Sequence, residues 1–117
     1  ALPRYGEQVH KTQRALARAE LQKVVLRQEQ YFTEQRAYAV NLAELGYPGD
    51  RYVLSRDGEA RAWPGGKGIY LITMEADRGA FRVAAVPLQV DSRCGTLSLD
   101  GLGIRGAGGP GGVANCW

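Results

Sequence analysis

The chain has 117 residues, 44% of them hydrophobic, and a formal net charge of +3, values typical of one globular domain with a core of moderate size. No stretch approaches the 18 or so consecutive apolar residues that a membrane-spanning helix needs, and no basic segment followed by an apolar run stands at the N-terminus. Neither a membrane anchor nor a signal peptide is therefore visible within this sequence, which leaves open a segment removed from before Ala1. We expect residues 1–117 to form a single domain.

Positive charge is concentrated in the first third of the chain. Residues 1–40 contain seven Lys and Arg against four Asp and Glu, whereas the remaining residues are balanced at eight against eight. A basic segment of this kind could bind nucleic acid, but a solvated helix face is the commoner explanation of a small surplus. We therefore favour the solvated face.

Residues from about 4 to 38 have the pattern of one long amphipathic helix. Between Pro3 and Gly46 the only other glycine or proline is Gly6. Apolar positions recur at steps of three and four with basic residues between them, which predicts one helix face packed on a sheet. That face consists of Ala17, Leu21, Val24, Val25, Gln28 and Phe32.

The first part of this helix has little apolar surface. Before Arg14 it offers only Tyr5 and Val9 as large apolar side chains. We expect this front half to be covered by something outside the chain. Tyr5 and Val9 are therefore candidate partner contacts, and so are Arg14 and Arg18. The basic side chains of Lys11, Arg14 and Arg18 are expected to be exposed.

After the helix the pattern changes to that of strands and turns. Residues 39–67 predict a variable loop, with a helical turn closed by Gly46 and a strand at Tyr52–Ser55. Residues 68–117 predict the sheet and the C-terminal region. Further strands are expected at residues 69–74, 80–88 and 96–99, with Ile104 in the return arm of a last hairpin. A long helix followed by a four-stranded antiparallel sheet is an α+β fold.

The two cysteines, Cys94 and Cys116, enclose a glycine-rich stretch near the C-terminus. Their spacing is not that of a zinc site, and the sequence has no CxxC motif. A disulfide formed in an oxidising compartment is the interpretation we favour, because it would hold a segment with seven glycines between residues 101 and 112. Two reduced, buried thiols in a cytosolic protein are the alternative.

No set of side chains in the sequence supports catalysis, a cofactor or a metal. The single histidine, His10, has no partner at a ligand-like spacing except Glu7. Three aspartates lack the spacing of a calcium loop and are better explained as turn residues. They are Asp77, Asp91 and Asp100. Trp63 and Trp117 lie on expected loops, where each could anchor a partner or cover part of the core.

Several short motifs occur in the order in which they occur in type IV pilins. They are the Pro3-Xaa-Tyr5 entry to the helix, the pair Tyr31-Phe32, Tyr38, the LGY of residues 45–47, the CGTLSLD that begins at Cys94, and the final Cys116-Trp117. Residues 49–67 match the pattern only loosely. The chain resembles a PilE-like minor pilin that lacks the hydrophobic N-terminal part of its helix.

This resemblance implies a membrane-spanning segment before Ala1, cut from its leader by a prepilin peptidase. It implies a protein held at the periplasmic face of the bacterial inner membrane and then assembled into an extracellular pilus. It also implies that the front half of the helix packs among the helices of other pilin subunits, while the back half packs on its own sheet. Within the sequence, the acidic residue that pilins carry in the membrane segment cannot be assigned.

Two functions follow from the resemblance. The first is a structural one: a minor pilin that promotes pilus assembly, links a tip complex and adhesin to the major pilin, and supports adhesion or twitching motility. The second is DNA capture by a minor pilin, which we favour less because the excess charge lies on a helix that a filament would largely cover. A major pilin is a further alternative. A pseudopilin is disfavoured, because that group predicts a calcium loop in place of the C-terminal cysteine pair.

Overall fold

The structure is a computed structural model that describes residues 2–65 and 67–117, with side chains described from Gly6 onward. It begins with helix α1 (Leu2–Gln35) and ends with the short helix α2 (Gly112–Cys116). Between them lie a 3-10 turn, η1 (Ala43–Leu45), and six strands. The strands are β1 (Tyr52–Ser55), β2 (Ala60–Ala62), β3 (Gly68–Ala76), β4 (Phe81–Pro87), β5 (Leu97–Asp100) and β6 (Arg105–Ala107).

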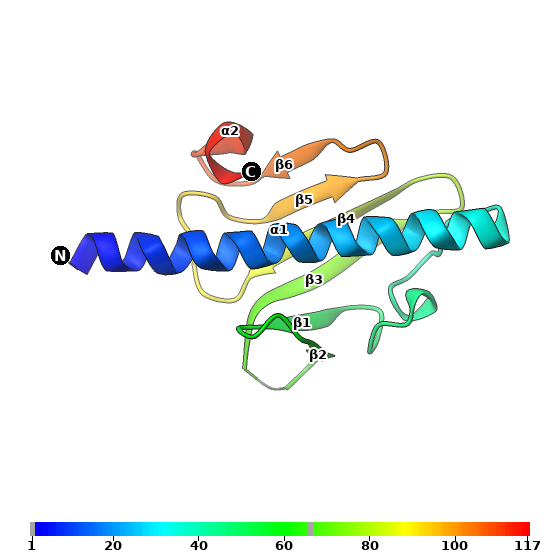
Figure 1. The fold of residues 1–117 in the computed structure, drawn as a ribbon, viewed down its shortest axis with the longest axis horizontal. Helices are drawn as coiled ribbons and strands as arrows, with labels where there is room; N and C mark the ends of the chain where they lie inside the picture. Colours follow the sequence, from blue (N-terminus) through cyan, green and yellow to red (C-terminus); the bar gives the residue numbers. More distant parts are fainter. Residues whose placement is uncertain (1, 66) are drawn as a thin grey trace.

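The strands form one antiparallel sheet in the order β2-β1-β3-β4-β5-β6, and α1 crosses one of its faces (Figure 1). The first turns of α1 extend past the sheet, at the left of Figure 1, and α2 lies near this part of the helix. The α+β arrangement expected from the sequence is therefore confirmed. Helix α1 packs on a single sheet, and the C-terminal region of the chain lies beside the front half of α1.

The sheet has six strands where the sequence predicts four. The two additional strands are β2, which was not expected, and β6, which was expected only as a return arm around Ile104. They have only three residues each, Ala-Arg-Ala and Arg-Gly-Ala. Such segments lack the alternation and the β-branched side chains that identify a strand in a sequence, and they form because a longer neighbour offers its backbone groups. The return arm begins at Arg105, and Ile104 precedes it with an exposed side chain.

Helix α1 ends at Gln35, three residues before the expected boundary. Arg36 takes a left-handed conformation with φ of 61°, which stops the helix although the residue is not glycine. The chain then turns so that Tyr38 packs between two rings, with centroids 4.7 Å from Phe32 and 4.8 Å from Phe81. A helical continuation would carry Tyr38 away from Phe81 on β4.

The middle of α1 is buried against the sheet. Ala17, Leu21, Val24 and Gln28 are fully buried, and Val25 is partly buried beside them. The side-chain amide of Gln28 is satisfied inside the core, because its Nε2 donates to the carbonyl of Ala39 and its Oε1 accepts from the Ala39 amide, both at 2.9 Å. Phe32 departs from the expectation of burial, being 37% exposed, because the helix is already passing the end of the core there.

A buried polar pair fixes the register between α1 and β1. Tyr52 donates its hydroxyl proton to Glu20 Oε2 at 2.5 Å, and both side chains are buried. The Tyr52 ring stacks on Tyr47 with centroids 4.5 Å apart, and the Arg27 guanidinium lies 4.3 Å from the Tyr47 centroid. Burial raises the pKa of Tyr52, with the neighbouring Glu20 carboxylate adding to the shift, so this hydroxyl stays a donor at neutral pH.

Candidate functional site

The front half of α1 is joined to the loop between β4 and β5 by a buried ion pair. Arg14 Nε lies 2.7 Å from Asp91 Oδ2, and Arg14 Nη2 lies 2.8 Å from Asp91 Oδ1. A third guanidinium nitrogen, Nη1, donates to Glu7 Oε1 at 3.1 Å. Arg14 is 3% exposed and Asp91 is 6% exposed. The expectation that Arg14 is exposed is therefore wrong, because Asp91, far along the chain, supplies a buried partner.

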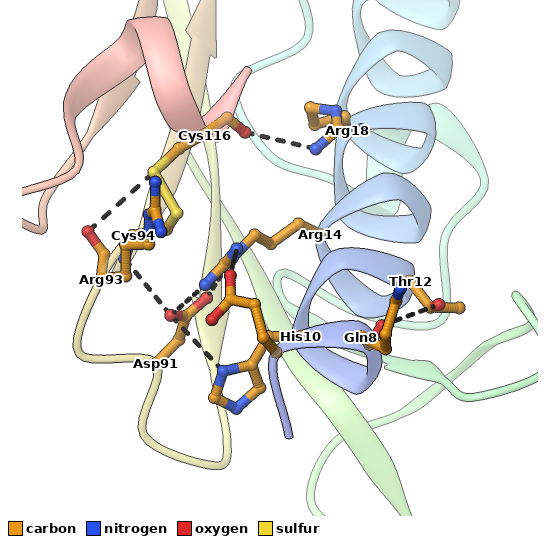
Figure 2. A network of polar contacts seen from close by, with 10 residues as sticks. Gln8, His10, Thr12, Arg14, Arg18, Asp91, Arg93, Cys94 and Cys116 are labelled. Atoms are coloured by element: carbon orange, nitrogen blue, oxygen red, sulfur yellow. Dashed lines mark hydrogen bonds and ion pairs between the residues drawn. A yellow bond between two sulfur atoms is a disulfide. The ribbon is translucent and has the colours of Figure 1, made fainter. Parts of the chain in front are cut away.

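The surroundings of Asp91 favour its ionised form. Hydrogen bonds from the Arg14 guanidinium are the main cause that lowers the pKa of this carboxyl, although burial opposes the shift. Asp91 also accepts the Cys94 amide at 3.3 Å, and His10 Nδ1 lies 3.8 Å from Asp91 Oδ1. Figure 2 shows Arg14 and His10 pointing from the helix toward this carboxylate. Asp91 thus connects α1 to the loop between β4 and β5, which contains Cys94.

Cys94 and Cys116 form a disulfide that closes the C-terminal segment (Figure 2). The enclosed chain is also held by backbone bonds, since the Gly109 amide donates to the Cys94 carbonyl and the Gly111 amide donates to the Arg93 carbonyl, both at 2.8 Å. On the helix side, Arg18 Nη1 donates to the Cys116 carbonyl at 3.3 Å. The end of the chain is therefore fastened to the front half of α1.

A hollow of about 310 Å³, which we call the basic hollow, lies between α1 and this closed segment. Its lining comprises Glu7, Lys11, Arg14, Arg18, Arg93, Ala114, Asn115 and Trp117. Trp117 is held in place because its Nε1 donates to the Gly106 carbonyl at 2.8 Å. The guanidinium of Arg105 lies 5.3 Å from the Trp117 ring centroid, which adds a fourth exposed or half-buried cation to Lys11, Arg18 and Arg93.

Three of the predicted partner contacts meet at this place, whereas Val9 and Trp63 lie elsewhere. Arg14, Arg18 and Trp117 all line the basic hollow. Val9 is half-buried and lines a separate groove on α1 with Leu16 and Arg56. Trp63 is 41% exposed and follows β2, at the far side of the sheet. The side chain of Tyr5 lies outside the described residues.

The sequence analysis missed Arg93 and Arg105 as site residues. Arg93 precedes Cys94 and lines the hollow, whereas Arg105 begins β6 and lies beside the Trp117 ring at the margin of the hollow. The only available signal was that Arg93 adjoins a cysteine. Asp77 and Asp100 act as turn residues, each accepting backbone amides of the following residues, whereas Asp91 pairs with Arg14.

Within the described part of the chain, no three His, Cys, Asp or Glu side chains gather closely enough to hold a metal ion. The same part contains no helix that combines the length and the apolar character required to cross a bilayer.

A long helix laid over an antiparallel sheet, with a disulfide-closed C-terminal region, defines the type IV pilin fold. A family model described as "Type IV minor pilin ComP, DNA uptake sequence receptor" matches residues 3–98, which is most of the chain. The chain therefore belongs to this family of type IV minor pilins. Searches of curated proteins and of solved structures returned no significant match. The matched range includes Lys11, Arg18 and Arg93, while Arg105 and Trp117 follow it.

Proposed function

We propose that this minor pilin binds DNA in the basic hollow, as a structural subunit of a pilus and not as an enzyme. The observation that carries the proposal is that Lys11, Arg18 and Arg93 line the hollow together with Trp117, whose ring also lies next to the guanidinium of Arg105. Lysine and arginine neutralise phosphates, and an aromatic ring offers a surface for a base or a sugar. The description of the matching family, a DNA uptake sequence receptor, supports the same ligand class.

The distribution of charge in three dimensions supports this proposal better than the distribution along the sequence. Residues after 40 are balanced in formal charge, but Asp91 is buried and neutralised by Arg14. Glu7, the acidic residue that lines the basic hollow, also contacts Arg14. Both acidic groups near the hollow are therefore engaged by one buried arginine. The remaining cations, Lys11, Arg18 and Arg93, face the hollow without an ion-pair partner among the described residues.

DNA binding is tested with the triple variant Lys11→Gln, Arg93→Gln and Arg105→Gln. Binding of a labelled duplex oligonucleotide to the wild type and to this variant is measured by fluorescence anisotropy at several salt concentrations. Arg18 is left intact because it bonds to the Cys116 carbonyl. Each lost phosphate contact should reduce the slope of log affinity against log salt by about 0.9, so the variant should show a slope smaller by about 2–3 units. Affinity at low salt should fall at least tenfold.

The matched control removes three exposed cations that do not line the hollow, Arg36→Gln, Arg51→Gln and Arg78→Gln. Both triple variants lose the same net charge, so non-specific attraction changes equally in both. The proposal requires that the control keep most of the salt dependence and affinity. Equal losses in the two variants would contradict a localised site, and unchanged binding in both would contradict DNA binding by this domain at the hollow.

A second role, in pilus assembly, is supported by the first turns of α1, which extend past the sheet (Figure 1). We propose that other pilin subunits, major and minor, pack against this part of the helix, and that the subunit passes from the inner membrane to an extracellular pilus. Promotion of assembly, linkage of a tip complex or adhesin, and support of adhesion or twitching motility belong to this proposal. Incorporation requires the full-length pilin with the membrane segment expected before Ala1.

The assembly role is tested with Val9→Arg in the full-length pilin, because Val9 is half-buried in its own domain and lies on the projecting half of α1. We expect less of the variant in sheared pili, measured by immunoblot, while DNA binding of the isolated 117-residue domain stays unchanged. The hollow variant should give the reverse pattern. Normal incorporation of Val9→Arg would contradict packing of other subunits at this position.

A further inference from the structure

A second hollow, of about 370 Å³, lies on the face of the sheet that α1 does not cover. Side chains alternate between the two faces along each strand. Ile72, Val83 and Leu97 point into the core beneath α1, so their neighbours point outward. The outward side chains that line this hollow include Thr73, Glu75, Arg82, Thr96 and Ser98. We call it the outer hollow, and none of its lining residues lines the basic hollow.

The two charged groups of the outer hollow are neighbours that do not contact each other as an ion pair. Glu75 on β3 stands directly opposite Arg82 on β4, which is a position where an ion pair commonly forms. No ion pair between them occurs in the described structure. Instead, Arg82 Nη2 donates to Ser98 Oγ at 3.1 Å across to β5. The carboxylate is left free to accept hydrogen bonds, and the other guanidinium nitrogens are left free to donate them.

Glycine at position 106 keeps the outer hollow open. A Cβ atom at Gly106 would clash with Ser98 Oγ and would lie 3.3 Å from Arg82 Nη2. Any larger residue on this part of β6 would therefore occupy the space into which the Arg82 and Ser98 groups are directed. The small side chains of Ala84 and Ala107 complete the floor. The result is a recess that combines polar side chains with small apolar ones.

We propose that the outer hollow binds a saccharide ring. Sugar hydroxyls donate and accept at the same time, and the recess offers a carboxylate that only accepts, a guanidinium that only donates, and hydroxyls that do both. One carboxylate beside one guanidinium leaves no net positive charge, so the recess does not select a polyanion such as DNA. None of the described residues that line it is aromatic, so a single sugar ring should bind weakly, with Kd on the order of 1 mM.

The test is a titration of the ¹⁵N-labelled 117-residue protein with three methyl glycosides, those of galactose, mannose and N-acetylglucosamine, followed by NMR. We expect at least one glycoside to shift the amide signals of Thr73, Thr96, Ser98 and Gly106 in a saturable way. Gly106→Val should abolish this response by filling the recess. Glu75→Ala and Arg82→Ala remove exposed groups, should leave the fold intact, and should each weaken binding at least tenfold.

The control is the triple variant of the basic hollow, Lys11→Gln, Arg93→Gln and Arg105→Gln, which should lose DNA binding and keep the glycoside response. The two proposals therefore fail independently. Three results would overturn saccharide binding: no saturable shift with any of the three glycosides, a response that persists in Glu75→Ala and Arg82→Ala, or a duplex oligonucleotide that shifts these amides when the glycosides do not.

Discussion

Arg14 and Asp91 lie 77 positions apart in the sequence and form a two-pronged ion pair in which Nε and Nη2 of the arginine meet the two carboxylate oxygens at 2.7 and 2.8 Å. The pair joins the front half of α1 to the loop before Cys94. This bidentate ion pair, and not apolar packing, thus attaches the front half of α1 to the rest of the domain. One face of the front half is therefore covered by the domain itself, and only the remaining faces of the helix can contact partners.

The first prediction concerns the stability that depends on this pair. Arg14→Met should lower the free energy of unfolding by about 3–5 kcal/mol, because it leaves the Asp91 carboxylate buried without its counter-charge. The double variant Arg14→Met with Asp91→Asn should lose less than the sum of the two single variants. Lys11→Met, an exposed position on the same helix, is the control and should change stability by no more than about 0.5 kcal/mol.

Urea denaturation of the wild type, the two single variants, the double variant and Lys11→Met measures these differences. If Arg14→Met costs no more than Lys11→Met, the pair is not buried in solution. The burial of Arg14 also makes this residue unsuitable as a probe of contacts with other pilin subunits. Charge reversal at Arg14 would damage the domain itself, so exposed or half-buried positions such as Val9 are better probes of assembly.

The second prediction is a loss of stability in acid that depends on Asp91. Hydrogen bonds from Arg14 lower the pKa of Asp91 in the folded protein, so folding favours its ionised form. Its contribution is therefore complete above the ordinary aspartate pKa of about 3.9 and is lost as pH falls through the lowered pKa. We expect the unfolding free energy of the wild type to fall more steeply than that of Asp91→Asn between about pH 5 and pH 2.

Urea denaturation at intervals across this range supplies the measurement. Other carboxyls with lowered pKa, Glu44 and Asp57, are present in both proteins and cancel in the comparison. Parallel curves for wild type and Asp91→Asn would show that Asp91 titrates alike in the folded and unfolded chains, against the prediction.

The third prediction compares two positions of the helix face. Leu21 is fully buried in the core, whereas Phe32 is more than one-third exposed and packs mainly on Tyr38. Leu21→Ala should cost about 2–5 kcal/mol. Phe32→Ala should cost about 1–2 kcal/mol, since it loses partial burial and one aromatic pair. Thermal or urea unfolding of both variants decides, and an equal or larger loss at Phe32 would contradict this assignment of the core.

The parts of the fold that periodicity encodes could be predicted from the sequence. Leu21 and Val24 recur at helical spacing, which places them on one face of the helix. In β3 and β4, apolar and polar side chains alternate on either side of a turn at residues 77–79, so the local pattern implies that these two strands pair. The strands β2 and β6 have no such pattern, because their formation depends on neighbours. The end of α1 at Gln35 was missed for the same reason, since Arg36 adopts its conformation as Tyr38 packs on Phe81.

The site was harder to predict than the fold, because it depends on long-range contacts. Arg14 and Arg18 look equivalent in the sequence, four residues apart on a basic helix, yet one is buried against Asp91 and the other bonds to the Cys116 carbonyl. Counting charges along the chain also does not show which of them are paired in the fold. Arg93 was counted with acidic residues such as Asp91, although Asp91 is neutralised by a residue of the helix.

The bond from the Trp117 indole N–H to the Gly106 carbonyl has a consequence for how copies of this protein can associate. It holds the end of the chain against β6, the last strand of the sheet, and α2 lies beside that strand and covers this margin. At the opposite margin β2 is open but offers only three residues, with a charged Arg61 at their centre. A sheet that grows edge to edge through many copies needs two free edges on each copy. Backbone pairing through β2 alone can therefore join no more than two copies of this protein.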